Sequence, residues 1–272
     1  MAAPIHQESR LLLGLIGLAD ISGYTSFVRY RSLSLSHAEM IVTELMEGMI
    51  DAMVAPWVVN KLEGDAALLY AEISPTDAVE VGAAVAGLTR VFAAFDQARG
   101  RLVRERKNCG CDACTDLNQL RLKILVHSGE MVLKRVRQFE ELAGDAVILL
   151  HRLAKNDVPI HEYLLLTDAV MRELAGAAPP AERLQQTVAG WERPQTLWYL
   201  AEPQQCAALL ALRRPPAAAS PSPSASPSAS PSASAPVSAS SARFQHLPQA
   251  SRRPFRIWLD SMAMMLTPRR RV

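Results

Sequence analysis

The sequence lacks a strong charge of either sign, because 29 Lys and Arg residues nearly balance 27 Asp and Glu residues, for a formal net charge of +2. So balanced a chain gives no general electrostatic reason to bind nucleic acid, and we expect no such partner. Cysteine is also scarce: there are four in 272 residues, three of them within "NCGCDACTD". This arrangement is not the disulfide framework of a small secreted domain.

Long apolar runs are missing as well. The apolar run at residues 11–19 is short, ends on Asp20 and lacks a small-residue cleavage site, so we do not interpret it as a signal peptide. We expect no membrane span, because no apolar stretch approaches the roughly 20 residues that are needed to cross a bilayer. These absences predict a soluble, cytoplasmic protein.

The composition changes abruptly near residue 213. Residues 213–242 form a Pro/Ser/Ala repeat that has no means of burying a core, so we expect a disordered linker there. Residues 243–272 form a basic tail that combines Trp, Phe and Met with arginines. This tail is suited to an anionic membrane surface, and equally to a partner protein or to plain disorder. The folded unit is therefore expected over residues 9–204.

Within that unit, strand and helix patterns alternate in the order βαββαββαβαββ. Because several strands are joined as hairpins, the order predicts an α+β domain with a mixed, largely antiparallel sheet and helices layered on it. One helix has a capping box at Ser36 and Glu39, and another opens at Ser74–Asp77. The expected elements are a strand at 11–20, a helix from 36 to 53, a hairpin at 57–73 turning at Glu63-Gly64, a helix from 74 to about 106, a hairpin at 120–136 turning at Ser128-Gly129, a helix at 145–154, a strand at 162–167, a helix at 168–174, and strands at 184–190 and 196–201.

Two carboxylates carry the main chemical signal. Asp20 ends the first strand and Asp65 lies at the first hairpin turn, so a hairpin beside that strand would bring both to one sheet edge. Two acids at one edge repel each other, and Mg²⁺ or Mn²⁺ is the usual relief. Both residues are also ordinary turn formers, which is the alternative interpretation. The turn after Asp20 offers backbone N–H groups suited to phosphate oxygens, at Ile21, Ser22, Gly23, Tyr24 and Thr25.

Four segments occur in a distinctive order: "LADISGYTSF", "KLEGDAALLY", "LKILVHSGEMV" and "LAGDAVILLHRL". Together they resemble the catalytic domain of class III adenylyl and guanylyl cyclases over about residues 11–204. The chain looks most like an uncharacterised bacterial branch that carries a cysteine-rich insert. The resemblance implies a ferredoxin-like layered domain of the cyclase type.

The resemblance also implies roles for individual residues. Asp20 and Asp65, with the backbone of Ile21, would hold two divalent ions on a nucleoside triphosphate. Lys61 would read the purine edge, and Glu141 would stand where adenylyl cyclases usually have an Asp, which favours ATP over GTP. Arg152 would stabilise charge in the transition state. The family builds its site between two domains, and this chain has one, so a homodimer is implied.

One position departs from the family pattern. Three residues after Asp145, where the family has an Asn that orients the ribose, this chain has Ile148. Loss of one well-placed polar contact costs on the order of 10²–10³ in rate. The sequence therefore leaves two functions open: conversion of ATP to cyclic AMP and pyrophosphate, and nucleotide binding without turnover.

The cysteine-rich loop supports a third function, as a metal or redox sensor. Cys109, Cys111 and Cys114 have the spacing C-x-C-x₂-C, which suits Zn²⁺ or an iron–sulfur cluster if a fourth ligand is found. Cys206 or a residue of a partner chain is a candidate for that ligand. Three reduced thiols in a surface loop, or a local disulfide, are the alternatives.

Overall fold

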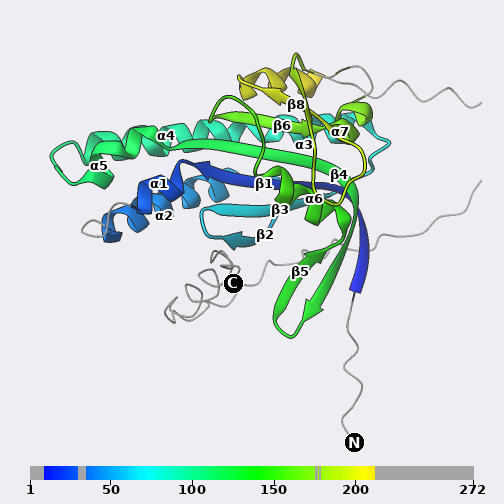
Figure 1. Cartoon of the computed structure of the whole chain (residues 1–272), viewed down its shortest axis with the longest axis horizontal. Helices are drawn as coiled ribbons and strands as arrows, with labels where there is room; N and C mark the ends of the chain where they lie inside the picture. Colours follow the sequence, from blue (N-terminus) through cyan, green and yellow to red (C-terminus); the bar gives the residue numbers. More distant parts are fainter. Residues whose placement is uncertain (1–8, 30–34, 175–176, 178, 212–272) are drawn as a thin grey trace, which may run out of the picture. The chain divides into compact units, whose positions relative to one another are not determined.

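The computed structural model of the protein describes residues 9–29, 35–174, 177 and 179–211 (Figure 1). The expected linker at 213–242 and the basic tail at 243–272 lie outside the described residues, so both remain predictions. The elements are β1 (Ser9–Ser22), α1 (Tyr24–Arg29), α2 (Leu35–Asp51), β2 (Val58–Glu63), β3 (Ala66–Glu72), α3 (Ala78–Gly87), α4 (Thr89–Glu105), α5 (Asp112–Asp116), the 3₁₀ turn η2 (Leu117–Gln119), β4 (Arg121–Val136), β5 (Phe139–Ala143), α6 (Asp145–Leu153), β6 (Tyr163–Thr167), α7 (Asp168–Glu173), β7 (Glu182–Gln186), β8 (Gln195–Leu200) and η3 (Pro203–Ala211).

The strands form one mixed sheet in the order β2-β3-β1-β4-β6-β8-β7, and β5 pairs with β4. Only the β4–β6 pair is parallel among the strand pairs of the described chain; the others are antiparallel. The predicted α+β layered domain with a largely antiparallel sheet is therefore confirmed. In Figure 1 the long β4 crosses the domain, and its far end forms with β5 a hairpin that projects from the body.

The central strand β1 is apolar almost throughout because both faces of the sheet are covered. On one face Leu15, Ala19 and Ile21 pack in a core with residues of α2, α3 and α4. On the other face Ile16 and Leu18 pack with residues of α6. Since side chains alternate between faces along a strand, one run of apolar residues supplies both layers.

The predicted hairpin turn at Ser128-Gly129 is wrong. Both residues continue the strand β4, where they pair with Leu15 and Gly14 of β1. The turn instead follows Val136, at Arg137, whose φ of 58° places it in the left-handed region. A local Ser-Gly turn signal is overridden here because the neighbouring strand supplies hydrogen-bond partners for the whole length of β4.

Two of the predicted helices also need correction. Ser36 is inside the first turn of α2, which already begins at Leu35, and Glu39 instead accepts a hydrogen bond from the Tyr24 hydroxyl at 3.3 Å. The helix expected from 74 to about 106 is two helices, α3 and α4, separated at Leu88. Asp77 is the N-cap residue of α3, because its carboxylate accepts hydrogen bonds from the backbone N–H groups of Val79 and Glu80 in the first turn of the helix.

Residues Ala78–Glu105 make up the one helical stretch of the described chain that is long and apolar enough, by length and composition, to cross a membrane. This corrects the expectation that no such stretch exists. Half of its most apolar window is buried inside the domain, and Val81, Val85 and Phe95 lie in the core against the sheet. A buried core helix meets the same criteria, so this stretch is weak evidence for a membrane span.

Candidate active site

The structure brings Asp20 and Asp65 to the same edge of the sheet. Asp20 lies near the end of β1, opposite Ala66 of β3, and Asp65 is in the tight turn that joins β2 to β3. The backbone N–H of Ile21 donates to the carbonyl oxygen of Asp65 at 3.2 Å, which fixes the hairpin against β1. The juxtaposition expected from the sequence is thus present in the fold.

The electrostatics of this pair are unfavourable for two negative charges. Burial raises the pKa of Asp65 to about 7, and the charge of Asp20 adds to the rise. Burial likewise raises the pKa of Asp20, although the ammonium group of Lys123 acts in the opposite direction. The raised pKa values mean that the site disfavours two negative charges, and a bound divalent cation would supply the positive charge that compensates them.

Lys123 is a third charged member of the site that the sequence analysis missed. It lies in β4 directly opposite Asp20, and its Nζ is 3.3 Å from the Asp20 Oδ2. The same ammonium group donates to the backbone carbonyl oxygen of Ala154 at 3.1 Å. The available signal was a lysine flanked by Leu122 and Ile124 in the strand sequence "LRLKILV". Lys123 therefore provides the positive charge nearest to Asp20 in the described chain.

A pocket of about 520 Å³ opens in front of these residues. The turn Ile21–Thr25 lines one side of it, and His151 and Lys155 line another. Gly23 has a φ of +93°, a left-handed conformation that favours glycine and lets the chain turn at once from β1 into α1. The predicted phosphate-facing residues Gly23, Tyr24 and Thr25 therefore share one pocket with both aspartates.

Lys61 and Glu141 also meet. The Lys61 Nζ lies 2.8 Å from a carboxylate oxygen of Glu141 and 3.1 Å from one of Glu63. Burial of Lys61 lowers its pKa, but its hydrogen bonds to Glu141 and Glu63 outweigh this, so the pKa is raised. The pair joins β2 to β5, which are 80 residues apart in sequence. The two residues implied to read a purine thus form one ion pair.

Arg152 and Ile148 occupy the exposed side of α6, four residues apart and so on the same helix face. The Arg152 guanidinium lies over the ring of Trp191, 5.4 Å from its centroid. Ile148 is 47% exposed, so its side chain is accessible from solvent in one copy of the chain. Neither residue lines the pocket that holds Asp20 and Asp65.

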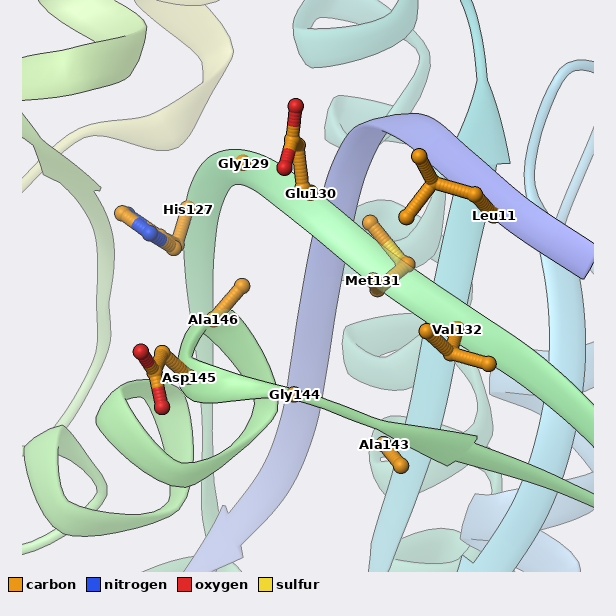
Figure 2. Close-up of a pocket in the computed structure, with 10 residues that line it drawn as sticks. All are labelled: Leu11, His127, Gly129, Glu130, Met131, Val132, Ala143, Gly144, Asp145 and Ala146. Carbon is orange, nitrogen blue, oxygen red and sulfur yellow. The ribbon is translucent and has the colours of Figure 1, made fainter.

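A second pocket, of about 450 Å³, lies between β4 and the start of α6 (Figure 2). In Figure 2 Ala146 points toward Gly129, where an added Cβ would lie 3.2 Å from the Ala146 Cβ. Burial lowers the pKa of His127 to about 4, and the neutral ring is hydrogen-bonded to the Thr167 hydroxyl at 2.9 Å. This histidine is thus a neutral, hydrogen-bonded part of the fold rather than a charged group.

The cysteine loop gains a ligand that the sequence analysis did not name. His37, in the first turn of α2, lies against Cys109, Cys111 and Cys114, and all four potential ligand atoms are within 4.8 Å of one another. Cys206, the candidate for the fourth position, is fully buried in the core and is not part of this group. A histidine from a distant helix therefore completes the cluster.

Comparison with known proteins places the fold. The domain resembles two solved catalytic proteins, the adenylyl cyclase CyaB from P. aeruginosa and the guanylyl cyclase Cya2, each with a TM-score of 0.56. The identities are 15% and 17%, and the matches cover 71% and 72% of this chain and 95% and 93% of those chains. The chain thus has the fold of class III adenylyl and guanylyl cyclase catalytic domains, as the motif order predicted.

The sequence comparisons point to an uncharacterised branch. The model of a protein family of unknown function, DUF2652, matches residues 42–163, a range that includes Lys61, Asp65 and the three clustered cysteines. The uncharacterised protein Rv2561/Rv2562 of Mycobacterium tuberculosis is 34% identical over 129 residues. That match covers 47% of this chain and 58% of the relative, so the chain spans less than two thirds of that protein's length.

Proposed function

We propose that the protein is a nucleotide cyclase-like enzyme, which converts ATP to cyclic AMP and pyrophosphate at a homodimer interface. The observation that carries the proposal is the pair Asp20 and Asp65, half-buried side by side in one pocket with an unmet need for positive charge. In the reaction the ribose 3′ oxygen forms a bond to the α-phosphorus, the bond to the β-phosphate oxygen breaks, and the hydroxyl proton passes to solvent.

The donor set fits Mg²⁺ or Mn²⁺, because both ions prefer carboxylate and carbonyl oxygens. Asp20, Asp65 and the backbone carbonyl of Ile21 would hold them. When bound, such ions neutralise triphosphate charge and make a coordinated hydroxyl more acidic. Lys123 competes for Asp20, so a metal–nucleotide complex must draw this carboxylate away from a lysine that is already 3.3 Å from it.

The remaining residues would bind and orient the nucleotide. The ion pair between Lys61 and Glu141 would open when the nucleotide binds. Lys61 would then donate to a purine ring nitrogen or oxygen, and Glu141 would accept from the adenine amino group. A carboxylate acceptor favours adenine, whose exocyclic group is a donor, over guanine, whose corresponding group is an acceptor. The Arg152 guanidinium, which lies over the Trp191 ring in the single chain, would stabilise the charge that develops on the phosphates.

A second copy of the chain completes this arrangement. Lys61, Glu141 and Arg152 do not line the pocket of Asp20 and Asp65 within one chain. A homodimer would place these residues of one protomer over the aspartates of its partner and would make two equivalent sites. The exposed Ile148 side chain then lies near nucleotide rather than water.

Ile148 also supports a second candidate function, a nucleotide-binding regulator without turnover. An isoleucine at this position cannot donate or accept a hydrogen bond from the ribose. The pocket and the purine-reading pair could then bind ATP while the orientation needed for attack is lost. The two candidates differ in product formation and agree on binding.

The deciding experiment measures cyclic AMP and cyclic GMP formed by the purified full chain with ATP or GTP and Mn²⁺. We expect cyclic AMP from the wild type, none from Asp65→Ala, and wild-type rates from Asp51→Ala, an exposed acid at the end of α2 that serves as matched control. ATP binding without product in the wild type and in Ile148→Asn would favour the regulator. Failure to bind either nucleotide would refute both candidates.

We further propose that the protein acts in the cytoplasm, where nucleoside triphosphates are abundant. The basic tail at residues 243–272 would add contact with an anionic membrane surface. Flotation with vesicles containing anionic lipid, comparing the full chain with a chain ending at residue 242, tests this contact. Equal flotation of the two chains would count against it.

A further inference from the structure

Three cysteines and one histidine converge at the end of the domain where α1, α2 and α5 meet (Figure 1). The His37 Nδ1 lies 3.4 Å from the Cys111 Sγ, 3.6 Å from the Cys109 Sγ and 3.9 Å from the Cys114 Sγ. The Cys109 and Cys111 sulfurs are 3.5 Å apart. All four side chains are partly exposed, so a metal ion can reach them from solvent.

These separations are those of ligands around one tetrahedral ion. Zn²⁺ binds thiolate sulfur at about 2.3 Å and imidazole nitrogen at about 2.0–2.1 Å, which at the tetrahedral angle places two sulfurs about 3.8 Å apart and a sulfur and nitrogen about 3.6 Å apart. The observed distances of 3.4–3.9 Å fall around these values. The cluster therefore already has nearly the spacing that a bound zinc ion requires.

Backbone structure holds three of the ligands in place. The Cys109 N–H donates to the carbonyl of Arg106 at 2.9 Å, which closes a turn after α4, and Cys111 is the N-cap residue of α5, the helix that carries Cys114. The Thr115 N–H and hydroxyl both donate to the Cys111 carbonyl, at 3.0 and 3.1 Å. The loop is thus a preformed turn that presents its sulfurs toward α2.

The alternatives from the sequence fit this geometry less well. A [2Fe–2S] cluster divides its ligands between two iron atoms, so ligands on different irons lie farther apart than ligands on one ion. Here every pair of ligand atoms is within 4.8 Å. A disulfide requires a sulfur separation near 2.05 Å, and the cysteines of the described chain are free thiols. Three thiolates with one imidazole are instead a common structural zinc set.

We propose that His37, Cys109, Cys111 and Cys114 bind one structural Zn²⁺, which joins the loop after α4 to the start of α2. His37 is 72 to 77 residues from the three cysteines along the chain, so the ion closes a long loop, where a cross-link restricts the unfolded chain most. Glu39, two residues beyond His37, accepts a hydrogen bond from Tyr24 of α1. The zinc site would thereby steady the α1–α2 corner, next to the turn that contains Gly23.

The test is the metal content and coordination of the untagged full chain, purified without chelators or added metal. We expect one zinc ion per chain, and X-ray absorption at the zinc edge should show about three sulfur ligands at 2.3 Å and one nitrogen at 2.0–2.1 Å. Both readouts use the wild-type protein, so they do not depend on the folding of a variant. Removal of zinc by a chelator should lower the melting temperature, and added Zn²⁺ should restore it.

Variants then identify the ligands. His37→Ala and Cys111→Ser should weaken zinc binding by more than about 100-fold, since the loss of a group that only hydrogen-bonds to a metal ligand already costs about 10–100-fold. His161→Ala and Cys206→Ala are matched controls that should keep the zinc ion, because neither residue belongs to the cluster. Iron with acid-labile sulfide, a disulfide with no metal, or a wild type that binds no zinc when Zn²⁺ is supplied in excess would each overturn the proposal. Equal zinc binding by His37→Ala and the wild type would exclude His37 as the fourth ligand.

Discussion

Replacing Asp65 by Asn should stabilise the metal-free protein above neutral pH. The pKa of the Asp65 carboxyl rises from 3.8 to about 7 on folding, chiefly because burial and the neighbouring Asp20 disfavour its negative charge. Between about pH 4 and pH 7 the folded state therefore binds more protons than the unfolded state, and stability falls as the pH rises through this window. Above it the destabilisation is complete.

The magnitude follows from the size of that pKa difference. A difference of about 3 on the pKa scale corresponds to about 4 kcal/mol, at about 1.4 kcal/mol for each unit. Because the carboxyl is only half-buried, we expect Asp65→Asn to raise the free energy of unfolding by about 2–4 kcal/mol at pH 8. At a pH near 4 the wild-type carboxyl is already neutral in the folded state, so the variant and the wild type should differ by less than about 1 kcal/mol.

Urea denaturation at both pH values, in the presence of EDTA, measures these differences. Asp51→Asn is the control, because Asp51 is an exposed acid at the end of α2 and its replacement should change stability by no more than about 0.5 kcal/mol at either pH. If Asp65→Asn destabilises the protein at pH 8, or has the same effect at both pH values, the two carboxylates do not oppose each other and the electrostatic reasoning for the cation site is wrong.

Three further perturbations follow from the structure. Lys123→Met removes the positive charge beside Asp20 and should lower the free energy of unfolding by about 1–3 kcal/mol at pH 8, with a smaller loss at pH 4; equal losses at the two pH values in urea titrations would contradict an ionic role. Phe95→Ala leaves a cavity at a fully buried position and should lower the free energy of unfolding by about 3–5 kcal/mol. Phe139→Ala, at a position 59% exposed, should lower it by about 0.5 kcal/mol or less, and similar losses for the two variants would refute the assigned core. Arg137→Gly relieves a left-handed backbone at the β4–β5 turn and should raise the melting temperature by the equivalent of about 0.5–1 kcal/mol; a lower melting temperature would show that the arginine side chain contributes more than its backbone costs.

Much of the fold could be predicted because the deciding signals are local. The apolar run ending on Asp20 became β1, and the Glu63-Gly64 signal became the β2–β3 turn, since an apolar run and a glycine with positive φ specify these features without distant partners. The Ser128-Gly129 signal failed because its outcome depended on β1, more than a hundred residues earlier in the chain. Local preference gave way to a ladder of hydrogen bonds.

The candidate site divides in the same way. Asp20 and Asp65 could be paired from the sequence because one ends a strand and the other lies at the turn of a hairpin that the topology sets beside it. Lys123 and His37 could not be placed, because each acts through a neighbour that only the tertiary fold provides. A charged residue in an apolar strand and a histidine in a chain with three clustered cysteines were the signals available. Each signal points to the residue itself but not to the residue that it contacts in the fold.

The place of β1 in the sheet has a consequence for how the protein is made. The strand pairs on one side with β3, which ends at Glu72, and on the other with β4, which begins only at Arg121. A nascent chain leaves the ribosome from its N-terminus, so β1 emerges before β4, its second partner. Contacts between residues so distant along the chain form slowly, because the intervening loop must first close. Until β4 arrives, an apolar strand edge is unpaired, and this is the stage at which the growing chain most needs protection from association with other chains.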